Sequence, residues 1–119
     1  MLYLIGISKQ IYTFVLVLSH IKIKVAVPKD YEKTYSVIVN NEILKLYTDK
    51  DSINKSFIEN CTSIFFKKLN EILKKNASNE RFYLLYGGND LGALLLDEKQ
   101  FEIIKERYKE NSGDIPYLP

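Results

Sequence analysis

The chain has 119 residues and a mass of 13.9 kDa, which is room for one hydrophobic core but not for two. Hydrophobic residues make up 46% of it and charged residues 27%, a composition that excludes an intrinsically disordered chain. The formal net charge of +2 argues against a general polyanion-binding protein. We therefore predict a single domain over residues 1–119.

The charge is unevenly distributed along the chain. From Asn89 onward, seven acidic and four basic residues give a formal charge of −3, which leaves +5 for the preceding residues. Such an asymmetry affects the choice of partner and the rate of association more than it affects the fold. We expect an acidic face in the C-terminal part, opposite a mildly basic body.

Cysteine usage and the apolar N-terminal residues bear on location. Cys61 is the only cysteine, so no disulfide can form within the chain, and we expect a cytoplasmic protein. The N-terminal apolar residues lack a basic region before them and are interrupted by Lys9 and Gln10, so we interpret them as core strand rather than signal peptide. The run Ile11–Leu18 is too short to span a bilayer.

The first residues predict strands. Leu2–Ile7 is a short apolar run, and Ile11–Leu18 is rich in β-branched and aromatic residues, as in a strand buried on both faces. Residues 21–27 alternate with period two, which predicts one buried face and one exposed face. Pro28 closes this strand because it cannot donate to a ladder.

A hairpin and a long helix follow. Residues 34–39 and 42–48 flank Asn40-Asn41, and asparagine tolerates the positive φ that a tight two-residue turn needs. From about Ser52 to Lys75, apolar residues recur at spacings of three and four, which predicts a helix with one apolar stripe. The candidates for its N-cap are Asp49, Asp51 and Ser52.

The second half predicts two more strands and a capped helix. Apolar residues 81–86 and 91–96 are separated by Gly87-Gly88-Asn89-Asp90, which indicates a tight connection. Asp97 and Gln100 have capping-box spacing at the start of a helix expected from about Glu98 to Lys109, with Ser112-Gly113 ending it. The whole order predicts an α+β fold, a largely antiparallel sheet with two helices packed on it.

No complete catalytic or metal-binding motif is present. His20 is the only histidine, so a histidine triad or metal cluster lacks its partners, and Cys61 lies on the apolar stripe of a predicted helix. The glycines from Gly87 to Gly92 lead into a strand without the lysine of a phosphate loop, which favours a structural turn. We expect no cofactor, no metal and no enzyme activity, although catalysis by carboxylates alone or with the help of backbone groups stays open.

A basic set of side chains could contact phosphates, and weak nucleic-acid binding through a basic sheet or helix face is the alternative function. No RNA-binding motif joins these lysines to the aromatic residues. A small enzyme of unknown activity is the other alternative. The lysines concerned are Lys22, Lys24, Lys67, Lys68, Lys74 and Lys75.

Surface recognition of another protein is the function that the residues favour. Tyrosines and acids gather around the two polar breaks of the acidic C-terminal part, and tyrosine is a frequent anchor in protein interfaces. The alternative that these tyrosines and acids are ordinary loop and tail residues stays open. The predicted partner-binding residues are Tyr86, Asn89, Asp90, Asp114 and Tyr117.

The layout resembles small bacterial immunity proteins, which sit beside polymorphic or contact-dependent toxins and block them. The resemblance lies in a compact α+β chain rich in Lys, Asn, Ile and Tyr, in the segment Tyr86-Gly87-Gly88-Asn89-Asp90-Leu91, and in the end Ile115-Pro116-Tyr117-Leu118-Pro119. It implies a cytoplasmic antitoxin that occludes the site of a cognate toxin. Many such proteins are acidic, whereas this chain carries +2 overall, so only its C-terminal part fits that pattern.

Overall fold

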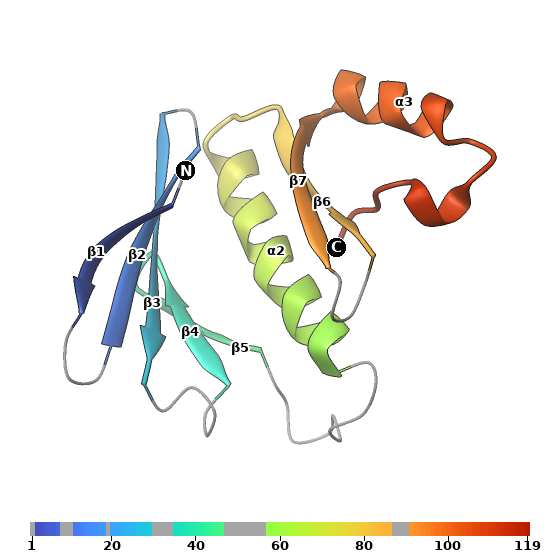
Figure 1. The fold of residues 1–119 in the computed structure, drawn as a ribbon. Coiled ribbons are helices and arrows are strands. Elements are labelled where there is room, and N and C mark those ends of the chain that lie inside the picture. The colour runs from blue at the N-terminus through green and yellow to red at the C-terminus, as the bar shows by residue number, and fades with distance from the viewer. Residues whose placement is uncertain (1, 8–10, 19, 30–34, 47–56, 87–90) are drawn as a thin grey trace. The chain divides into compact units, whose positions relative to one another are not determined.

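The computed structural model describes residues 2–7, 11–18, 20–29, 35–46, 57–86 and 91–119 (Figure 1). The elements follow the predicted order of five strands, a helix, two strands and a helix, which confirms the α+β class. The chain divides into two compact units, Met1–Ser52 and Ile53–Pro119. Each unit is described by itself, and the single domain stays a prediction.

The first unit is an antiparallel sheet whose strands lie side by side in chain order (Figure 1). Each strand therefore pairs with the strand that follows it in the sequence, as short connections favour. The strands are β1 (Leu2–Ile7), β2 (Ile11–Leu18), β3 (Ile21–Pro28), β4 (Ser36–Val39) and β5 (Glu42–Lys45).

Burial along β3 confirms the period-two prediction over most of the strand. Ile21, Ile23 and Val25 are buried, while the lysines between them are exposed. Ala26 is also buried, so the alternation ends one residue before Val27. Pro28 is the last residue of the strand, as expected, and lies opposite Ile11 of β2.

The prediction that Ile11–Leu18 is buried on both faces is wrong. Of the side chains described in β2, those of residues 13–17 are partly exposed and only Leu18 is buried. The described residues of this unit form strands and no helix, so the unit supplies no second layer of its own for both faces of β2. An apolar run predicts a strand but does not reveal how many layers will cover it.

The hairpin between β4 and β5 forms where two asparagines predicted it. Asn40 and Asn41 both have positive φ, 48° and 68°, which is the signature of the type I′ turn. Asn40 is held further by β3, because its N–H donates to the carbonyl oxygen of Lys24 at 2.9 Å and its Oδ1 accepts from the N–H of Lys24 at 2.9 Å.

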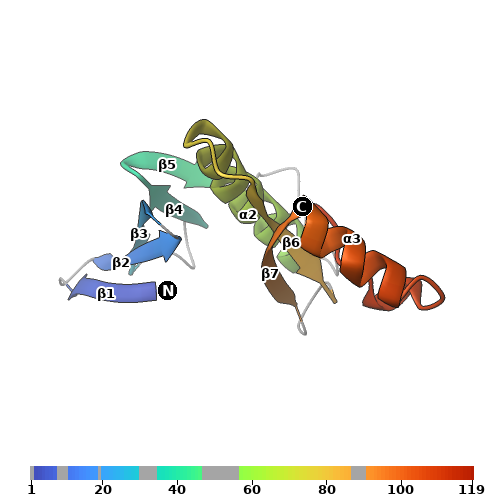
Figure 2. The same cartoon turned by 90° about the horizontal axis from the view of Figure 1, so that it is seen from above.

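The second unit is a two-stranded antiparallel sheet with one helix on each face (Figure 2). Phe82 of β6 packs on Phe66 of α2 with ring centroids 5.2 Å apart, and the next residue, Tyr83, stacks on Phe101 of α3 at 4.5 Å. Successive strand residues point to opposite faces, so the two helices cover opposite faces. The elements are α2 (Phe57–Lys75), β6 (Glu80–Leu85), β7 (Gly92–Asp97), α3 (Glu98–Arg107) and the 3₁₀ turn η2 (Ser112–Asp114).

The helix boundaries are partly as predicted. The capping box of α3 is confirmed, since Asp97 Oδ1 accepts from the N–H of Gln100 at 2.7 Å and Gln100 Oε1 accepts from the N–H of Asp97 at 3.0 Å. α3 ends at Arg107, two residues before the predicted Lys109, and Ser112-Gly113 lie in η2 instead of merely ending the helix. The N-cap candidates of α2, namely Asp49, Asp51 and Ser52, lie outside the described residues.

Candidate functional site

The best-defined polar contact of the predicted binding residues joins Tyr86 to Asp114. Tyr86 follows β6 directly and has a positive φ of 53°, and Asp114 is the last residue of η2. The phenol hydroxyl of Tyr86 donates to Asp114 Oδ1 at 2.6 Å, although the two residues are 28 positions apart. The contact fixes one end of a tyrosine side chain that is 50% exposed.

The C-terminal segment brings Tyr117 to the same strand. Its main chain forms an antiparallel bridge with Leu84, in which the N–H of Tyr117 donates to Leu84 O at 2.8 Å and the N–H of Leu84 donates to Tyr117 O at 2.7 Å. Leu84 and Tyr86 are two residues apart, so both predicted tyrosines lie near the end of β6. The Tyr117 side chain is 46% exposed while its backbone is held.

Tyr108 belongs to the same region and was not among the predicted binding residues. Its phenol lies near enough to Tyr86 to contribute to the raised pKa of that side chain, and it is exposed. Tyr108 falls within the helix predicted from about Glu98 to Lys109. Because α3 ends at Arg107, Tyr108 is the C-cap instead. We call Tyr86, Tyr108, Asp114 and Tyr117 the tyrosine surface.

The electrostatics of the tyrosine surface keep Tyr86 protonated. The hydrogen bond to Asp114 raises the pKa of the Tyr86 phenol above its ordinary value, and the negative charge of that carboxylate raises it further. The Tyr86 hydroxyl therefore stays a donor to Asp114, and the phenol of Tyr108 lies near Tyr86. This arrangement can accept hydrogen bonds from a partner and offers flat apolar rings around them.

Three of the five predicted binding residues are therefore close to one another through β6 and the segment after α3. Asn89 and Asp90 lie outside the described residues, so their placement stays a prediction.

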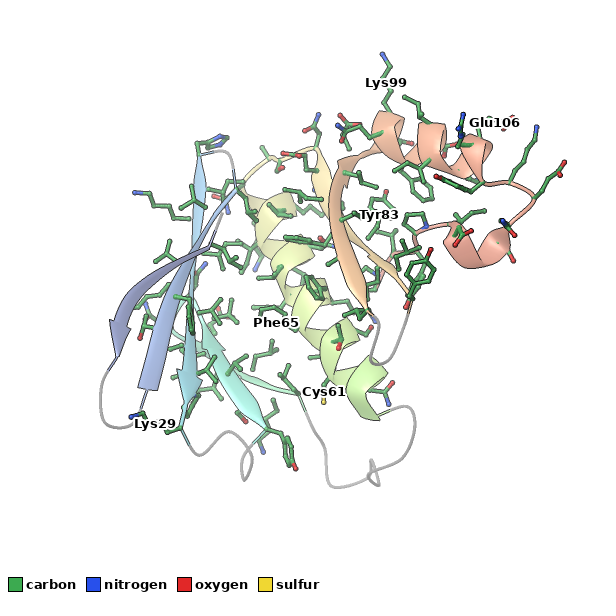
Figure 3. All side chains as sticks on the ribbon, viewed as in Figure 1. Lys29, Cys61, Phe65, Tyr83, Lys99 and Glu106 are labelled. Atoms are coloured by element: carbon green, nitrogen blue, oxygen red, sulfur yellow. The ribbon has the colours of Figure 1, made fainter. Side chains whose placement is uncertain are left out.

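A groove of about 970 Å³ lies along β6, the end of β7 and the first turn of α3. Tyr83, labelled in Figure 3, is one of its lining residues. The pKa of Tyr83 is raised by burial and by the nearby carboxylates of Glu98 and Glu102. Acidic and basic side chains mix along its walls, and one of the carboxylates, that of Asp97, is used by the capping box. Among the described residues of its lining there is no serine, cysteine or histidine.

The lysines predicted to contact phosphates are split between the two units. Lys22 and Lys24 are exposed on β3, whereas Lys67 and Lys74 of α2 line a second groove of about 400 Å³ with Arg81. The guanidinium of Arg81 is partly used already, because its Nη1 donates to the carbonyl oxygens of Ser78 and Glu80 at 2.7 and 2.6 Å.

The single histidine and the single cysteine belong to different units. His20 is exposed at the turn before β3. Cys61, labelled in Figure 3, is buried in α2 and is not part of a disulfide. Among the residues that the structure describes, no three His, Cys, Asp or Glu side chains are grouped so that they could hold a metal ion. No helix in the described ranges combines the length and the apolar character needed to cross a membrane.

Comparison with protein-family models finds no matching family, and comparisons with curated proteins and with solved structures find no significant match. The function must therefore be inferred from the geometry of this chain itself.

Proposed function

We propose that this chain is a cytoplasmic protein-binding module, an immunity protein that neutralises a cognate bacterial toxin by occluding its site. The observation that carries the proposal is the hydrogen bond between Tyr86 and Asp114. It holds an exposed aromatic side chain in one position, and a side chain already ordered loses less entropy when a partner binds it.

The composition of the tyrosine surface supports a protein partner. Tyr86 and Tyr117 present large rings, each about half exposed. The Tyr86 hydroxyl is bonded to Asp114 of η2, and the main chain of Tyr117 is bonded to Leu84 of β6. Tyrosine buries a large apolar area when a partner covers it while its hydroxyl still finds a hydrogen bond, which is why it is enriched among the residues that dominate binding energy.

The charge around this surface suits a basic partner. The residues from Asn89 onward carry a formal charge of −3, and Asp114 belongs to the tyrosine surface itself. Acidic groups near an interface raise the rate of association with a basic protein and suppress acidic competitors. A toxin that acts on nucleic acid has such a basic site, and this chain would cover it without chemistry of its own.

The test is the affinity of the purified protein for the toxin module encoded beside its own gene. We expect Tyr86→Ala and Tyr117→Ala each to weaken binding by about 2 kcal/mol or more, as for anchors that become buried. Ile43→Ala is the matched control, because Ile43 is 75% exposed in the other unit and should change nothing. Equal affinities for all four proteins would remove the tyrosine surface from the proposal.

A second candidate is weak nucleic-acid binding through the groove of Lys67, Lys74 and Arg81, which gathers three cations on α2 and β6. If this groove holds phosphates, the affinity for RNA falls steeply as salt rises and falls again in a Lys67→Glu/Lys74→Glu variant. No retarded RNA at low ionic strength would exclude it. Glu71 in the same groove reduces its net charge, which is why we place this function second.

A further inference from the structure

The two edges of the β6–β7 sheet differ in whether their outward main-chain groups have hydrogen-bond partners. The outward main-chain groups of β6 are hydrogen-bonded along the strand, beginning with the N–H of Glu80, which donates to Ser78 Oγ at 3.1 Å. The N–H and C=O of Phe82 are both bonded to the side-chain amide of Asn70. The N–H and C=O of Leu84 are both bonded to the main chain of Tyr117. This edge is closed to any further strand.

The opposite edge of β7 is open. Leu84 lies opposite Ala93, and Phe82 lies opposite Leu95. Residues directly opposite each other in an antiparallel pair point their main-chain groups either both toward each other or both away. Because Leu84 and Phe82 point theirs away from β7, Ala93 and Leu95 point their N–H and C=O away from β6. Among the described residues neither of these N–H and C=O pairs has a hydrogen-bond partner. At the end of the strand, the N–H of Asp97 is taken by Gln100.

The open edge also lacks the usual protection against another strand. The sequence of β7 is Gly-Ala-Leu-Leu-Leu-Asp. It contains neither proline nor, before Asp97, a charged residue, and these are the residues that usually prevent an edge strand from pairing with another strand. Ala93 and Leu94 are exposed, Leu94 by 37%.

We infer that β7 pairs with β7 of a second copy of this chain, antiparallel about a two-fold axis at Leu94, and so joins two β6–β7 sheets into one. In this register Ala93 of each copy lies opposite Leu95 of the other, and each exchanges both of its open hydrogen bonds. Leu94 meets Leu94 of the second copy on the face that also carries Tyr83, which removes its exposed surface from water.

Charge selects a second copy over a charged extended peptide. The paired stretch from Gly92 to Leu96 is neutral and offers no side chain to attract either sign. The two-fold axis at Leu94 places the two Asp97 carboxylates at opposite ends of the paired ribbon, about 20 Å apart at about 3.4 Å a residue. That separation exceeds the screening length of about 8 Å in physiological salt, so like charges do not oppose pairing. The interface is small, which predicts a weak, concentration-dependent dimer.

Sedimentation velocity over a concentration series tests the pairing with charge-swapped variants of the full chain. The unchanged protein should rise from the mass of one chain to that of two. Leu94→Lys and Leu94→Glu should each stay monomeric, because like charges meet at the axis, and an equimolar mixture of the two should recover the dimer. If a strand of another protein is the natural partner of β7, the unchanged protein stays monomeric at all concentrations, which overturns the proposal. A mixture of the two charged variants that fails to dimerise overturns it as well.

A second pair of variants separates loss of the edge from loss of the fold. Ala93→Pro removes an outward N–H that the β6 ladder does not use, so the domain should fold while the dimer weakens by about tenfold or more. Ala93→Ser keeps the N–H and should dimerise like the unchanged protein. If Ala93→Pro retains its circular dichroism spectrum and dimerises as strongly as Ala93→Ser, the edge is not the interface and the inference fails.

Discussion

The side-chain amide of Asn70 in α2 takes the place of a neighbouring strand for Phe82 in β6. Its Nδ2 donates to Phe82 O at 3.0 Å, and its Oδ1 accepts from the N–H of Phe82 at 2.7 Å. One side chain thus satisfies both outward main-chain groups of a residue whose ring packs on Phe66 of the same helix. The pair ties helix and strand together in the unit that carries the tyrosine surface.

Replacing Asn70 by alanine should therefore cost stability. Asn70→Ala leaves the N–H and C=O of Phe82 without partners in a part-buried setting, and we expect the free energy of unfolding to fall by about 2 kcal/mol in urea denaturation. Asn79→Ala is the matched control, because Asn79 is exposed and should change stability by less than about 0.5 kcal/mol. Equal midpoints for the two variants would contradict the bridging role.

Glycine at position 77 should stabilise the protein. Ala77 has a φ of 58° just after α2, where the N–H of Ala77 donates to Lys74 O at 3.1 Å and the N–H of Ser78 donates to Leu73 O at 3.0 Å. These are the bonds of a Schellman cap, in which glycine normally holds the left-handed position. Ala77→Gly should raise the free energy of unfolding by about 1 kcal/mol. A lower value in thermal or urea unfolding would contradict this account.

The capping box of α3 should contribute measurably as well. Asp97→Ala removes the acceptor for the N–H of Gln100 and should lower the free energy of unfolding by about 1 kcal/mol. Glu98→Ala, one residue further on and outside the box, is the control and should cost less. An unchanged midpoint for Asp97→Ala would show that the box is dispensable.

The bond between Tyr86 and Asp114 predicts an alkaline effect with a definite sign. The folded pKa of Tyr86 lies above the ordinary tyrosine value of 10.0, because the hydrogen bond and then the charge of Asp114 favour the protonated phenol. The stability from this contact is complete below the unfolded pKa and is lost as the pH rises through the folded one. Tyrosinate absorbance should show one tyrosine that ionises above the ordinary pH, and the Tyr86→Phe variant should lack this step. In the Asp114→Asn variant, Tyr86 should ionise at a lower pH than in the unchanged protein. Titration of Tyr86 at the ordinary value would contradict the contact.

Local signals in the sequence predicted local structure well. Asn40-Asn41 specified its turn through φ values that asparagine tolerates, and Asp97 with Gln100 specified a helix start through contacts three residues apart. Both signals come from residues close together in the sequence, although Asn40 is also held by Lys24 of β3. Spacing alone likewise predicted the order of strands and helices.

Features that depend on distant residues were not predictable in the same way. The partial exposure of β2 depends on which layers cover it, and the bridge from Leu84 to Tyr117 depends on the path of the segment after α3. Tyr108 was expected inside the last helix but is its C-cap, because α3 ends at Arg107, two residues before the predicted end. The sequence predicted Tyr86 and Asp114 to belong to one binding surface, but it did not predict the hydrogen bond between them.

The most direct test of the proposed function is growth of cells that express the toxin module encoded beside this gene, with and without this protein. We expect the unchanged protein and Ile43→Ala to restore growth, and Tyr86→Ala/Tyr117→Ala to restore little or none while remaining folded and abundant. If cells die equally fast with and without the unchanged protein, and no complex is recovered from them, the immunity function is contradicted.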